Sequence, residues 1–396
     1  MDVGKNLYFD PRVNAGMILI SKERINEVVS KYEGVTIGVI GSHSALDVCD
    51  GAKEEGLRNL VVCQRGREKT YERYFLSRGK IGIVDEVIVL NKFSEILKNE
   101  VQDTLREKGV VFVPNRSFTS YVPIERIESE FEVPMFGNRY LLRSEERGIE
   151  RDYYWLLERA GLPYPRKIDP EEIDCLVIVK LPHAVKRLER GFFTAASHQE
   201  FTEKAEKLMK IGVIKEEDLK RARIEEYVIG PVFNLDFFYS PIMEEEHGIG
   251  LELLGIDWRF ETSLDGHVRI PAAQQLTLPE NQFEPEYVVC GHSYSTLRES
   301  LLERAFELGE KYVEATKKYY PPGIIGPFTL QTVVDKDLEF YIYDVSPRIG
   351  GGTNAHMSIG HPYGNSLWRC RMSTGRRIAL EIKLGLERGE LEKLVT

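Results

Sequence analysis

The stretch FYIYDVSPRIGGGTN, residues 340–354, decides the fold expected for this chain. Its first half alternates aromatic and aliphatic residues, the pattern of a half-buried strand. Asp344, Ser346 and Arg348 follow two residues apart, so their side chains should lie on one face. Three glycines, 350–352, then allow a backbone to approach an anion closely. A carboxylate, a guanidinium and a glycine turn this close together predict a site that holds a metal ion against a phosphate chain. The simpler alternative is a strand that ends in a flexible loop with a surface ion pair.

The preceding segment, PPGIIGPFTLQTVV at residues 321–334, predicts the partner strand. A turn at residues 335–337 would pair it with residues 341–345 as a hairpin. That hairpin places Gln331 near Asp344, as a second oxygen ligand for a hard cation such as Mg²⁺ or Mn²⁺. Gln331 and Asp344 are therefore the predicted metal ligands, and the arrangement resembles the metal-triphosphate end of an ATP-grasp enzyme.

The first third of the chain alternates apolar strand patterns with helical ones, from VTIGVIGSHS at residues 35–44 to VVFV at residues 110–113. This alternation predicts an α/β fold with a parallel sheet and ligands at the carboxyl ends of its strands. Two loops, residues 41–44 and 114–118, fall at such ends. The first loop precedes a helix, whose N-terminus favours a phosphate. A hydroxyl-rich helix cap without a ligand is the alternative.

The middle of the chain contains a lysine in an apolar strand, CLVIVKL at residues 175–181. Burial of Lys180 is costly unless it meets an anion, which a nucleotide phosphate would supply, although an edge strand would let it reach water. The segment IEEYVI, residues 224–229, then reads as a linker whose backbone could hydrogen-bond an adenine edge. We also expect single helices over residues 93–108 and before Gly161, and a strand at residues 268–271.

Composition excludes several classes of protein. The chain has 396 residues, 42% hydrophobic and 29% charged, with a formal charge of −10, so two or three lobes are expected and nucleic acid is not the main partner. The five cysteines are scattered without C-x-x-C spacing, and the histidines form no zinc-ligand pattern. No apolar run reaches membrane-spanning length. A cytoplasmic protein without membrane contact is expected.

With these residues identified, the chain resembles the archaeal formate-dependent formaminoimidazole-carboxamide ribotide synthetases, the PurP family of the ATP-grasp superfamily. The matching segments run from GSHS, PMFGNR and LVIVK through IEEYV, FFYSP and LRES to S-x-R-x-x-GGTN. The resemblance implies an ATP-grasp fold preceded by a Rossmann-like parallel-sheet domain. An N-terminal arm would occupy residues 1–20, the Rossmann-like domain 21–135, the small lobe 136–230 and the large lobe 231–396.

The resemblance also implies an activity and roles for residues. That family makes formyl phosphate from formate and ATP, and the amine of a phosphorylated imidazole ribotide then attacks it. Lys180 and Arg348 would be catalytic, with Mg²⁺ on Gln331 and Asp344. The implied nucleotide-binding residues are Lys180, Glu225, Glu226, Tyr227, Val228 and Arg139. The implied substrate-binding residues are His43, Ser44, Ser117, Arg259, Arg298 and Asn354. Such ligases commonly form homo-oligomeric rings.

The chain departs from the family pattern at several positions. The phosphate-covering loop, PHAVKRLERG at residues 182–191, is nearly free of glycine where the family is glycine-rich. Asn115 and Arg116 replace a histidine and a glycine, Asp344 replaces a glutamate, and Gly350 replaces an aspartate. These changes leave open a paralogue with a different carboxylate and amine, for which Arg116 could bind an extra anion. They also leave open a non-catalytic nucleotide-binding subunit that assembles with an active paralogue.

Overall fold

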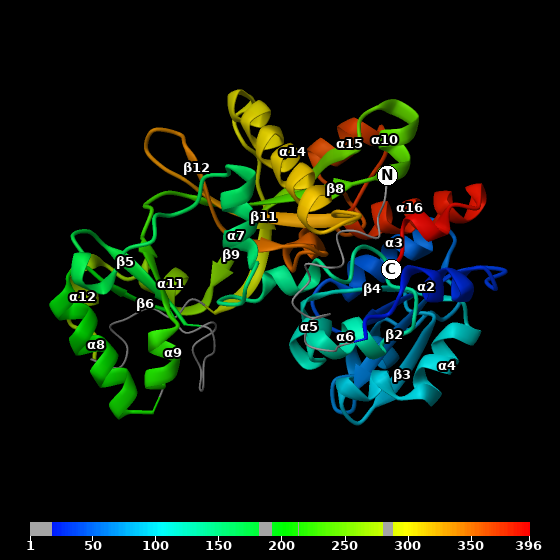
Figure 1. The fold of residues 1–396 in the computed structure, drawn as a ribbon, viewed down its shortest axis with the longest axis horizontal. Coiled ribbons are helices and arrows are strands. Elements are labelled where there is room, and N and C mark those ends of the chain that lie inside the picture. Colours follow the sequence, from blue (N-terminus) through cyan, green and yellow to red (C-terminus); the bar gives the residue numbers. More distant parts are fainter. Residues whose placement is uncertain (1–17, 182–191, 213, 280–287) are drawn as a thin grey trace.

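The computed structural model describes residues 18–181, 192–212, 214–279 and 288–396 (Figure 1). The chain folds around three sheets, one parallel and two antiparallel. The loop at residues 182–191, expected to cover the phosphates, lies outside the described residues, as does most of the expected arm. None of the helices described is both long enough and apolar enough to cross a membrane.

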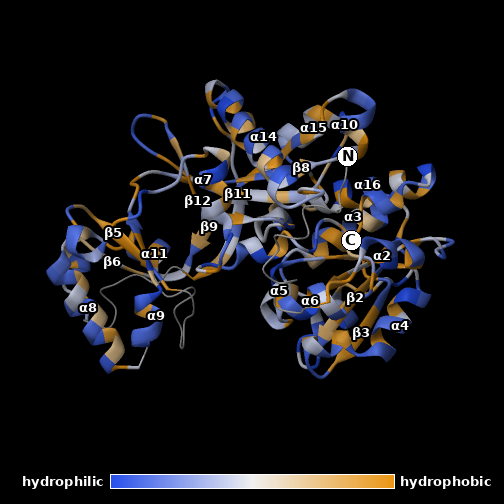
Figure 2. Cartoon of the chain, in the orientation of Figure 1, coloured by the Kyte–Doolittle hydropathy of each residue, from blue (hydrophilic) through white to orange (hydrophobic). Residues whose placement is uncertain are grey.

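The first sheet is parallel and has the strand order β3-β2-β1-β4. Its strands are β1 (Thr36–Ile40), β2 (Arg58–Gln64), β3 (Glu86–Leu90) and β4 (Val110–Val113). The surrounding helices are α2 (Lys22–Val29), α3 (Ala45–Glu54), α4 (Asn99–Glu107), α5 (Arg116–Tyr121) and α6 (Ile124–Glu130). Every residue of β1 and β4 is buried, as expected for parallel strands covered on both faces. The apolar strands and the polar outer helix faces are visible in Figure 2. The prediction of a Rossmann-like parallel sheet is confirmed.

The small antiparallel sheet has the order β6-β5-β7 and lies at the opposite end of the molecule from the parallel sheet (Figure 1). It contains β5 (Val177–Lys180), β6 (Phe192–Ala195) and β7 (Arg223–Glu226), with helices α8 (His198–Lys210) and α9 (Glu216–Lys220). Residues from β5, β6, β7 and α8 form a core of their own.

The large antiparallel sheet has the order β10-β9-β8-β11-β12 and occupies the middle of the molecule. Its strands are β8 (Val232–Tyr239), β9 (Leu251–Glu261), β10 (Val289–Tyr294), β11 (Gly326–Val334) and β12 (Phe340–Ser346). The helices of this part are α7 (Tyr153–Ala160), α10 (Pro241–His247), α14 (Leu302–Tyr319), α15 (Pro362–Trp368) and α16 (Thr374–Arg388). Alternate residues of β8 face opposite sides: Phe237 packs in the core that includes α7 and α14, and Phe238 in the core that includes α16. Since α16 also packs on α3, the large sheet and the parallel domain share one core.

The predicted hairpin is confirmed, with a register shift between Gln331 and Thr332. β11 and β12 pair antiparallel, and Gln331 is the register partner of Asp344.

Three predicted elements are wrong in extent or type. The helix expected over residues 93–108 is interrupted at Lys98, whose backbone is extended between a 3₁₀ turn (Phe93–Leu97) and α4. The turn buries Phe93 and Ile96 in the core of the parallel domain, and this packing overrides helix propensity. No strand forms at residues 268–271, because β9 continues to Glu261 and the short helices α11 (Thr262–His267) and α12 (Ala272–Gln275) follow.

The charged helix does end at Gly161, which has a left-handed φ of 62°. It is shorter than expected at its other end. It begins only at Tyr153, after Asp152, whose side chain accepts a hydrogen bond from the Trp155 amide.

Candidate active site

One large pocket, of about 1010 Å³, is lined by residues from the small sheet, the large sheet and the loops of the parallel domain. Its volume is sufficient for more than one small molecule. Most of the residues expected from the sequence line it: His43, Lys180, Glu225, Glu226, Tyr227, Val228, Arg259, Gln331, Asp344, Arg348 and Asn354. Four others, Ser44, Ser117, Arg139 and Arg298, are not among its lining residues.

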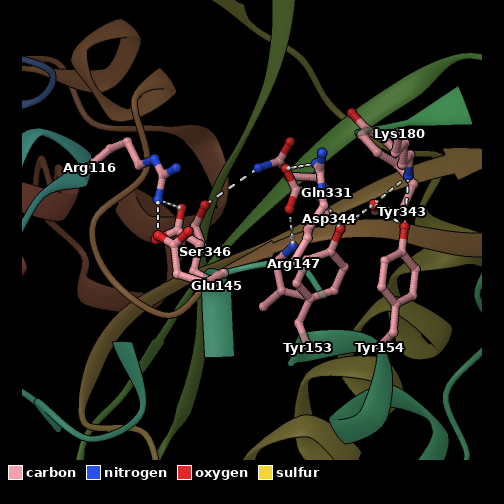
Figure 3. A network of polar contacts seen from close by, with 12 residues as sticks. Arg116, Glu145, Arg147, Tyr153, Tyr154, Lys180, Gln331, Tyr343, Asp344 and Ser346 are labelled. Carbon is pink, nitrogen blue, oxygen red and sulfur yellow. Dashed lines mark hydrogen bonds and ion pairs between the residues drawn. The ribbon is translucent and has the colours of Figure 1, made fainter. Parts of the chain in front are cut away.

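The β11–β12 hairpin brings Gln331 and Asp344 to one wall of the pocket (Figure 3). Both side chains are buried, and Asp344 Oδ2 lies 3.5 Å from Arg147 Nη2. Gln331 Nε2 donates to Ser346 Oγ at 3.4 Å, while Gln331 Oε1 finds no hydrogen-bond partner in the described part of the chain. A buried carbonyl oxygen without a partner is costly, and a cation would satisfy it.

These two ligands fit a hard cation that takes its remaining ligands from phosphate oxygens and water. Within the described residues, no three His, Cys, Asp or Glu side chains gather in a way that could hold a metal ion.

Lys180 faces this hairpin from β5, and it is buried, as predicted. Its ammonium pairs with the Glu225 carboxylate and donates to the Tyr154 hydroxyl oxygen at 2.8 Å and the Tyr343 carbonyl at 3.0 Å. Glu225 also accepts from Arg223 Nε at 2.9 Å and from the Tyr154 hydroxyl at 2.6 Å. Burial lowers the pKa of Lys180, and the Glu225 carboxylate opposes that shift.

The Glu225 side chain belongs to this network, since its carboxylate pairs with Lys180 and Arg223. β7 ends at Glu226, whose amide donates to the Arg166 carbonyl at 2.9 Å, and the Tyr227 amide donates to the Leu176 carbonyl at 2.9 Å. Glu226, Tyr227 and Val228 line the pocket, so the prediction that the backbone of this segment binds the adenine stays a prediction.

Arg348 lies beyond the end of β12 and is held by a residue that the sequence did not single out. Its Nη2 lies 2.5 Å from Glu145 Oε1, its Nε donates to Glu145 Oε2 at 3.3 Å, and its Nη1 donates to the Ile349 carbonyl at 2.7 Å. Arg116 Nη1 lies 3.6 Å from Glu145 and 3.2 Å from Glu146 (Figure 3). The carboxylates of Glu145 and Glu146 thus offset the positive charge of Arg116. This pairing argues against the expectation that Arg116 binds an extra anion of a substrate.

The first loop is tied to the glycine turn from both sides. Asn354 Nδ2 donates to the His43 carbonyl at 2.9 Å, and the Ser44 hydroxyl donates to the Gly350 carbonyl. Ser117 Oγ lies 3.3 Å from His43 Nδ1. His43 has a left-handed φ of 48° and lines the pocket. Ser44 and Ser117 support its loop through the contacts just described. Ser44 is fully buried, so its predicted direct contact with substrate is not supported.

Asn115 is also a structural residue. Its amide nitrogen donates to the carbonyls of Ile40 and Ser42, both at 3.0 Å, and its oxygen caps α5 by accepting from the Phe118 amide. The two loops at the carboxyl ends of β1 and β4 are joined by these bonds. Asn115 therefore supports the loop at residues 41–44 from the start of α5.

Of the three further arginines, only Arg259 reaches the pocket, where its guanidinium contacts the Tyr343 hydroxyl. Arg139 is fully buried and donates to the backbone carbonyls of Ile127, Phe131 and Val133 at 2.7–3.2 Å. Arg298 is exposed just before a 3₁₀ turn (Glu299–Leu301). The expectation that Arg139 and Arg298 bind anions at the site is wrong, because the fold places both elsewhere.

Sequence reasoning missed several pocket and support residues: Glu145, Arg147, Tyr154, Arg223, Asp257 and His292. Glu145 and Arg147 fall in a charged run that reads as a solvated helix face. The sequence shows only that charged residues are dense between two apolar segments. That density does not indicate which of the charged side chains are buried.

Comparison with known proteins places the chain in a family. Residues 37–168 match a family described as "Protein of unknown function (DUF1246)", and residues 200–396 match "Domain of unknown function (DUF1297)". Two archaeal proteins named 5-formaminoimidazole-4-carboxamide-1-(beta)-D-ribofuranosyl 5'-monophosphate synthetase are similar over 96% of this chain and all of their own length. The Methanopyrus kandleri protein is 46% identical over 382 residues, and the Methanothermobacter thermautotrophicus protein 43% over 384.

Comparison with solved structures leads to the same family. The crystal structure of an IMP biosynthesis protein PurP from Thermococcus kodakaraensis matches with a TM-score of 0.67 and 31% identity, covering 91% of this chain and all of that one. An ADP complex of N5-carboxyaminoimidazole ribonucleotide synthetase matches with a TM-score of 0.55 at 13% identity, covering 87% of this chain and 75% of that one, which shows a shared fold. The chain therefore belongs to the PurP family of formaminoimidazole-carboxamide ribotide synthetases, within the ATP-grasp superfamily.

Proposed function

We propose that this chain is an ATP-dependent ligase that activates formate and transfers the formyl group to the amine of aminoimidazole carboxamide ribotide. The observation that carries the proposal is the convergence of the Gln331–Asp344 hairpin, Lys180 and the His43 loop on one pocket. The 46% identity to a synthetase of that name, over nearly the whole chain, supports the choice of substrates.

We place the nucleotide between the small sheet and the hairpin. The backbone of Glu226–Val228 would bind the adenine, and Lys180 would contact the phosphates. Mg²⁺ on Gln331 and Asp344 would neutralise charge on the phosphoryl group that is transferred. Glu225, the Tyr154 hydroxyl and the Tyr343 carbonyl occupy the three N–H donors of the Lys180 ammonium, so a phosphate oxygen would replace one of these partners while the others keep the side chain in position.

Formate is proposed to bind beside Arg348 and the glycine turn. The three hydrogen bonds that Arg348 makes use three of the five N–H groups of a guanidinium, so two can still serve an anion. Glu145 fixes the guanidinium plane by a two-point contact, which fixes the direction of those donors.

The ribotide is proposed to bind at His43 and Asn354, where α3 begins behind the loop. Backbone N–H groups at a helix N-terminus favour its phosphate. Ser117 would act indirectly, because its hydroxyl lies at His43 Nδ1 and so orients the ring.

The test is an ADP-release assay with Mg·ATP, formate and the ribotide, with each omitted in turn and the product identified by mass spectrometry. Formylated ribotide that forms only in the complete mixture supports the proposal. ADP release with another carboxylate or amine alone would favour the altered-substrate alternative. Tight Mg·ATP binding without turnover in any mixture would favour the non-catalytic subunit.

We also propose that the chain assembles with copies of itself. Tyr294 is exposed on β10, the edge strand of the large sheet, where a second subunit could cover it. Light scattering after size-exclusion chromatography tests this, and a monomer at micromolar concentration contradicts it.

A further inference from the structure

Two buried carboxyl groups, Asp236 and Asp257, lie next to the glycine turn. Asp236 on β8 and Asp257 on β9 are 2% and 1% exposed. Asp236 Oδ1 accepts a hydrogen bond from Thr329 Oγ1 at 2.7 Å. Asp257 Oδ1 accepts one from Asn234 Nδ2 at 2.9 Å and lies 2.6 Å from His292 Nδ1. The roles proposed above for ATP, Mg²⁺ and formate leave this cluster without a function.

Burial, followed by the nearby Asp257 carboxylate, raises the pKa of Asp236 well above its ordinary value. The contact of 2.6 Å between His292 Nδ1 and Asp257 Oδ1 fixes the orientation of the imidazole. A proton on Nδ1 satisfies this contact and leaves the lone pair of the imidazole on Nε2.

His292 Nε2 lies at the glycine turn. His292 is on β10, its side chain is 19% exposed, and it lines the pocket together with Gly351 and His43. A Cβ added at Gly351 would lie 3.8 Å from His292 Nε2 and 3.6 Å from His43 Cδ2. Both imidazoles therefore lie beside Gly351, next to the proposed formate and ribotide sites.

Asp257 and Arg259 on β9 are the charged neighbours of His292, since Arg259 is the register partner of His292 and lines the same pocket. The neighbouring His356, from the 3₁₀ turn Gly352–His356, is buried, and burial lowers its pKa to about 4. His356 is therefore neutral at physiological pH and places no positive charge beside His292. Burial raises the pKa of Asp236, and the His43 ring lies beside Gly351.

We propose that His292, oriented by Asp257, accepts the proton of the amine that attacks the formyl group. In this step the amine nitrogen forms a bond to the formyl carbon, the bond from that carbon to the phosphate oxygen breaks, and inorganic phosphate leaves with the electron pair. The amine proton moves to His292 Nε2 and is later lost to solvent through the open pocket. The inference rests on the proposed formyl transfer and assigns His292 to its second half only.

The test separates the two halves with hydroxylamine, a strong nucleophile that traps an activated formyl group as formohydroxamate without a base. His292→Ala should retain formate-dependent hydroxamate formation within twofold of the wild-type rate. Its formylation of the ribotide should fall by at least about 100-fold, the usual loss for a missing general base. His247→Ala, at an exposed histidine on α10, is the matched control and should change neither rate.

His292→Gln separates proton acceptance from hydrogen bonding, because glutamine keeps polar atoms but cannot take a proton. A loss equal to that of His292→Ala supports the proposal. Formylation at the wild-type rate in either variant overturns it, as does an equal loss of hydroxamate formation. Wild-type protein that forms no hydroxamate at all overturns the proposed function, and this inference with it.

Asp257→Asn tests the positioning residue. The proposal predicts that the pH profile of ribotide formylation changes while that of hydroxamate formation does not. Parallel changes in both profiles would assign Asp257 a structural role and contradict the orientation of His292 by its charge.

Discussion

At the scale of single residues, the pocket is built from buried charges that the chain itself pairs. Arg348 and Glu145 are 203 positions apart, and Lys180 and Glu225 come from two neighbouring strands. Removing one member of such a pair leaves an uncompensated buried charge, which costs about 3–5 kcal/mol. Gln331 Oε1 is different, because its partner is not supplied by the described residues. A cation bound beside Asp344 would supply that partner.

The first prediction concerns the metal ligand Asp344. Asp344→Asn keeps the shape of the side chain but removes the charge that attracts Mg²⁺. The Kd for Mg·ATP measured by calorimetry should rise at least tenfold, equivalent to about 1.4 kcal/mol. The melting temperature without ligand should fall as well, because Arg147 loses the charge of its buried partner at 3.5 Å, although Arg147 keeps its hydrogen bond to the Tyr153 hydroxyl. Asp337→Asn, at an exposed position of the same hairpin, is the control. An unchanged Kd in Asp344→Asn would show that the metal assignment is wrong.

The second prediction concerns the proton on Asp236. Its pKa is raised in the folded state by burial and by Asp257, so folding stability from this group is fully present below the unfolded pKa of about 4 and declines as pH rises. Asp236→Asn mimics the protonated form. Relative to wild type, the variant should gain melting temperature progressively between pH 5 and pH 8. A constant difference between the two proteins over that range would contradict the protonated state.

At the scale of elements, the glycine turn at residues 350–352 follows the strand that carries Asp344. It contacts the loop that carries His43, because the Ser44 hydroxyl donates to the Gly350 carbonyl. A Cβ at Gly352 would lie 2.1 Å from the Asp257 carboxylate. At Gly351 the nearest atom would be 3.6 Å away, an ordinary contact. The requirement for glycine at position 352 is therefore steric, since its φ is not positive.

The third prediction compares these two glycines. Gly352→Ala should lower the free energy of unfolding by about 1–3 kcal/mol, as expected for overpacking. It should also weaken ribotide binding, because Asp257 and His292 must move. Gly351→Ala should fold with nearly the wild-type melting temperature. Thermal unfolding with and without the ribotide measures both effects, and equal behaviour of the two variants would contradict the steric argument.

At the scale of the whole molecule, the end of the chain closes on the parallel domain. Thr396 and Met135 exchange backbone hydrogen bonds of 2.9 and 3.1 Å. The Arg139 guanidinium links the Thr396 carbonyl to the carbonyls that follow α6. Burial lowers the pKa of Arg139 to about 10, so it remains charged at neutral pH. A buried cation surrounded by carbonyls stabilises the junction of lobes, far from the chemistry.

The fourth prediction follows from that position. Arg139→Met should lower the melting temperature by several degrees, since it leaves buried carbonyls without donors. Its Kd for Mg·ATP should stay within twofold of wild type. Arg298→Met, at an exposed arginine, should change neither property. A strong loss of nucleotide affinity in Arg139→Met, without loss of stability, would restore its expected role in binding.

The sequence by itself determined the local frame of the site. Alternation along residues 340–346 predicted the strand, and the turn after residue 334 predicted the hairpin, whereas a register shift between Gln331 and Thr332, which no sequence pattern indicated, makes Asp344 the partner of Gln331. The apolar surroundings of Lys180 predicted its burial. These features follow from a period of two residues and from short-range turn geometry, which a single sequence displays directly.

Only the tertiary structure decided which charges meet. Three pairs join separate elements: Glu145 with Arg348, Glu225 with Lys180, and Asp257 with His292. The sequence offers many other Asp and Glu residues as partners, and nothing in it distinguishes them from these three. The same holds for Arg139, which has the residue type of an anion site but the surroundings of a structural one. A charge acquires its role from burial and from the partners that packing brings within hydrogen-bond distance, and neither is encoded in the neighbouring residues.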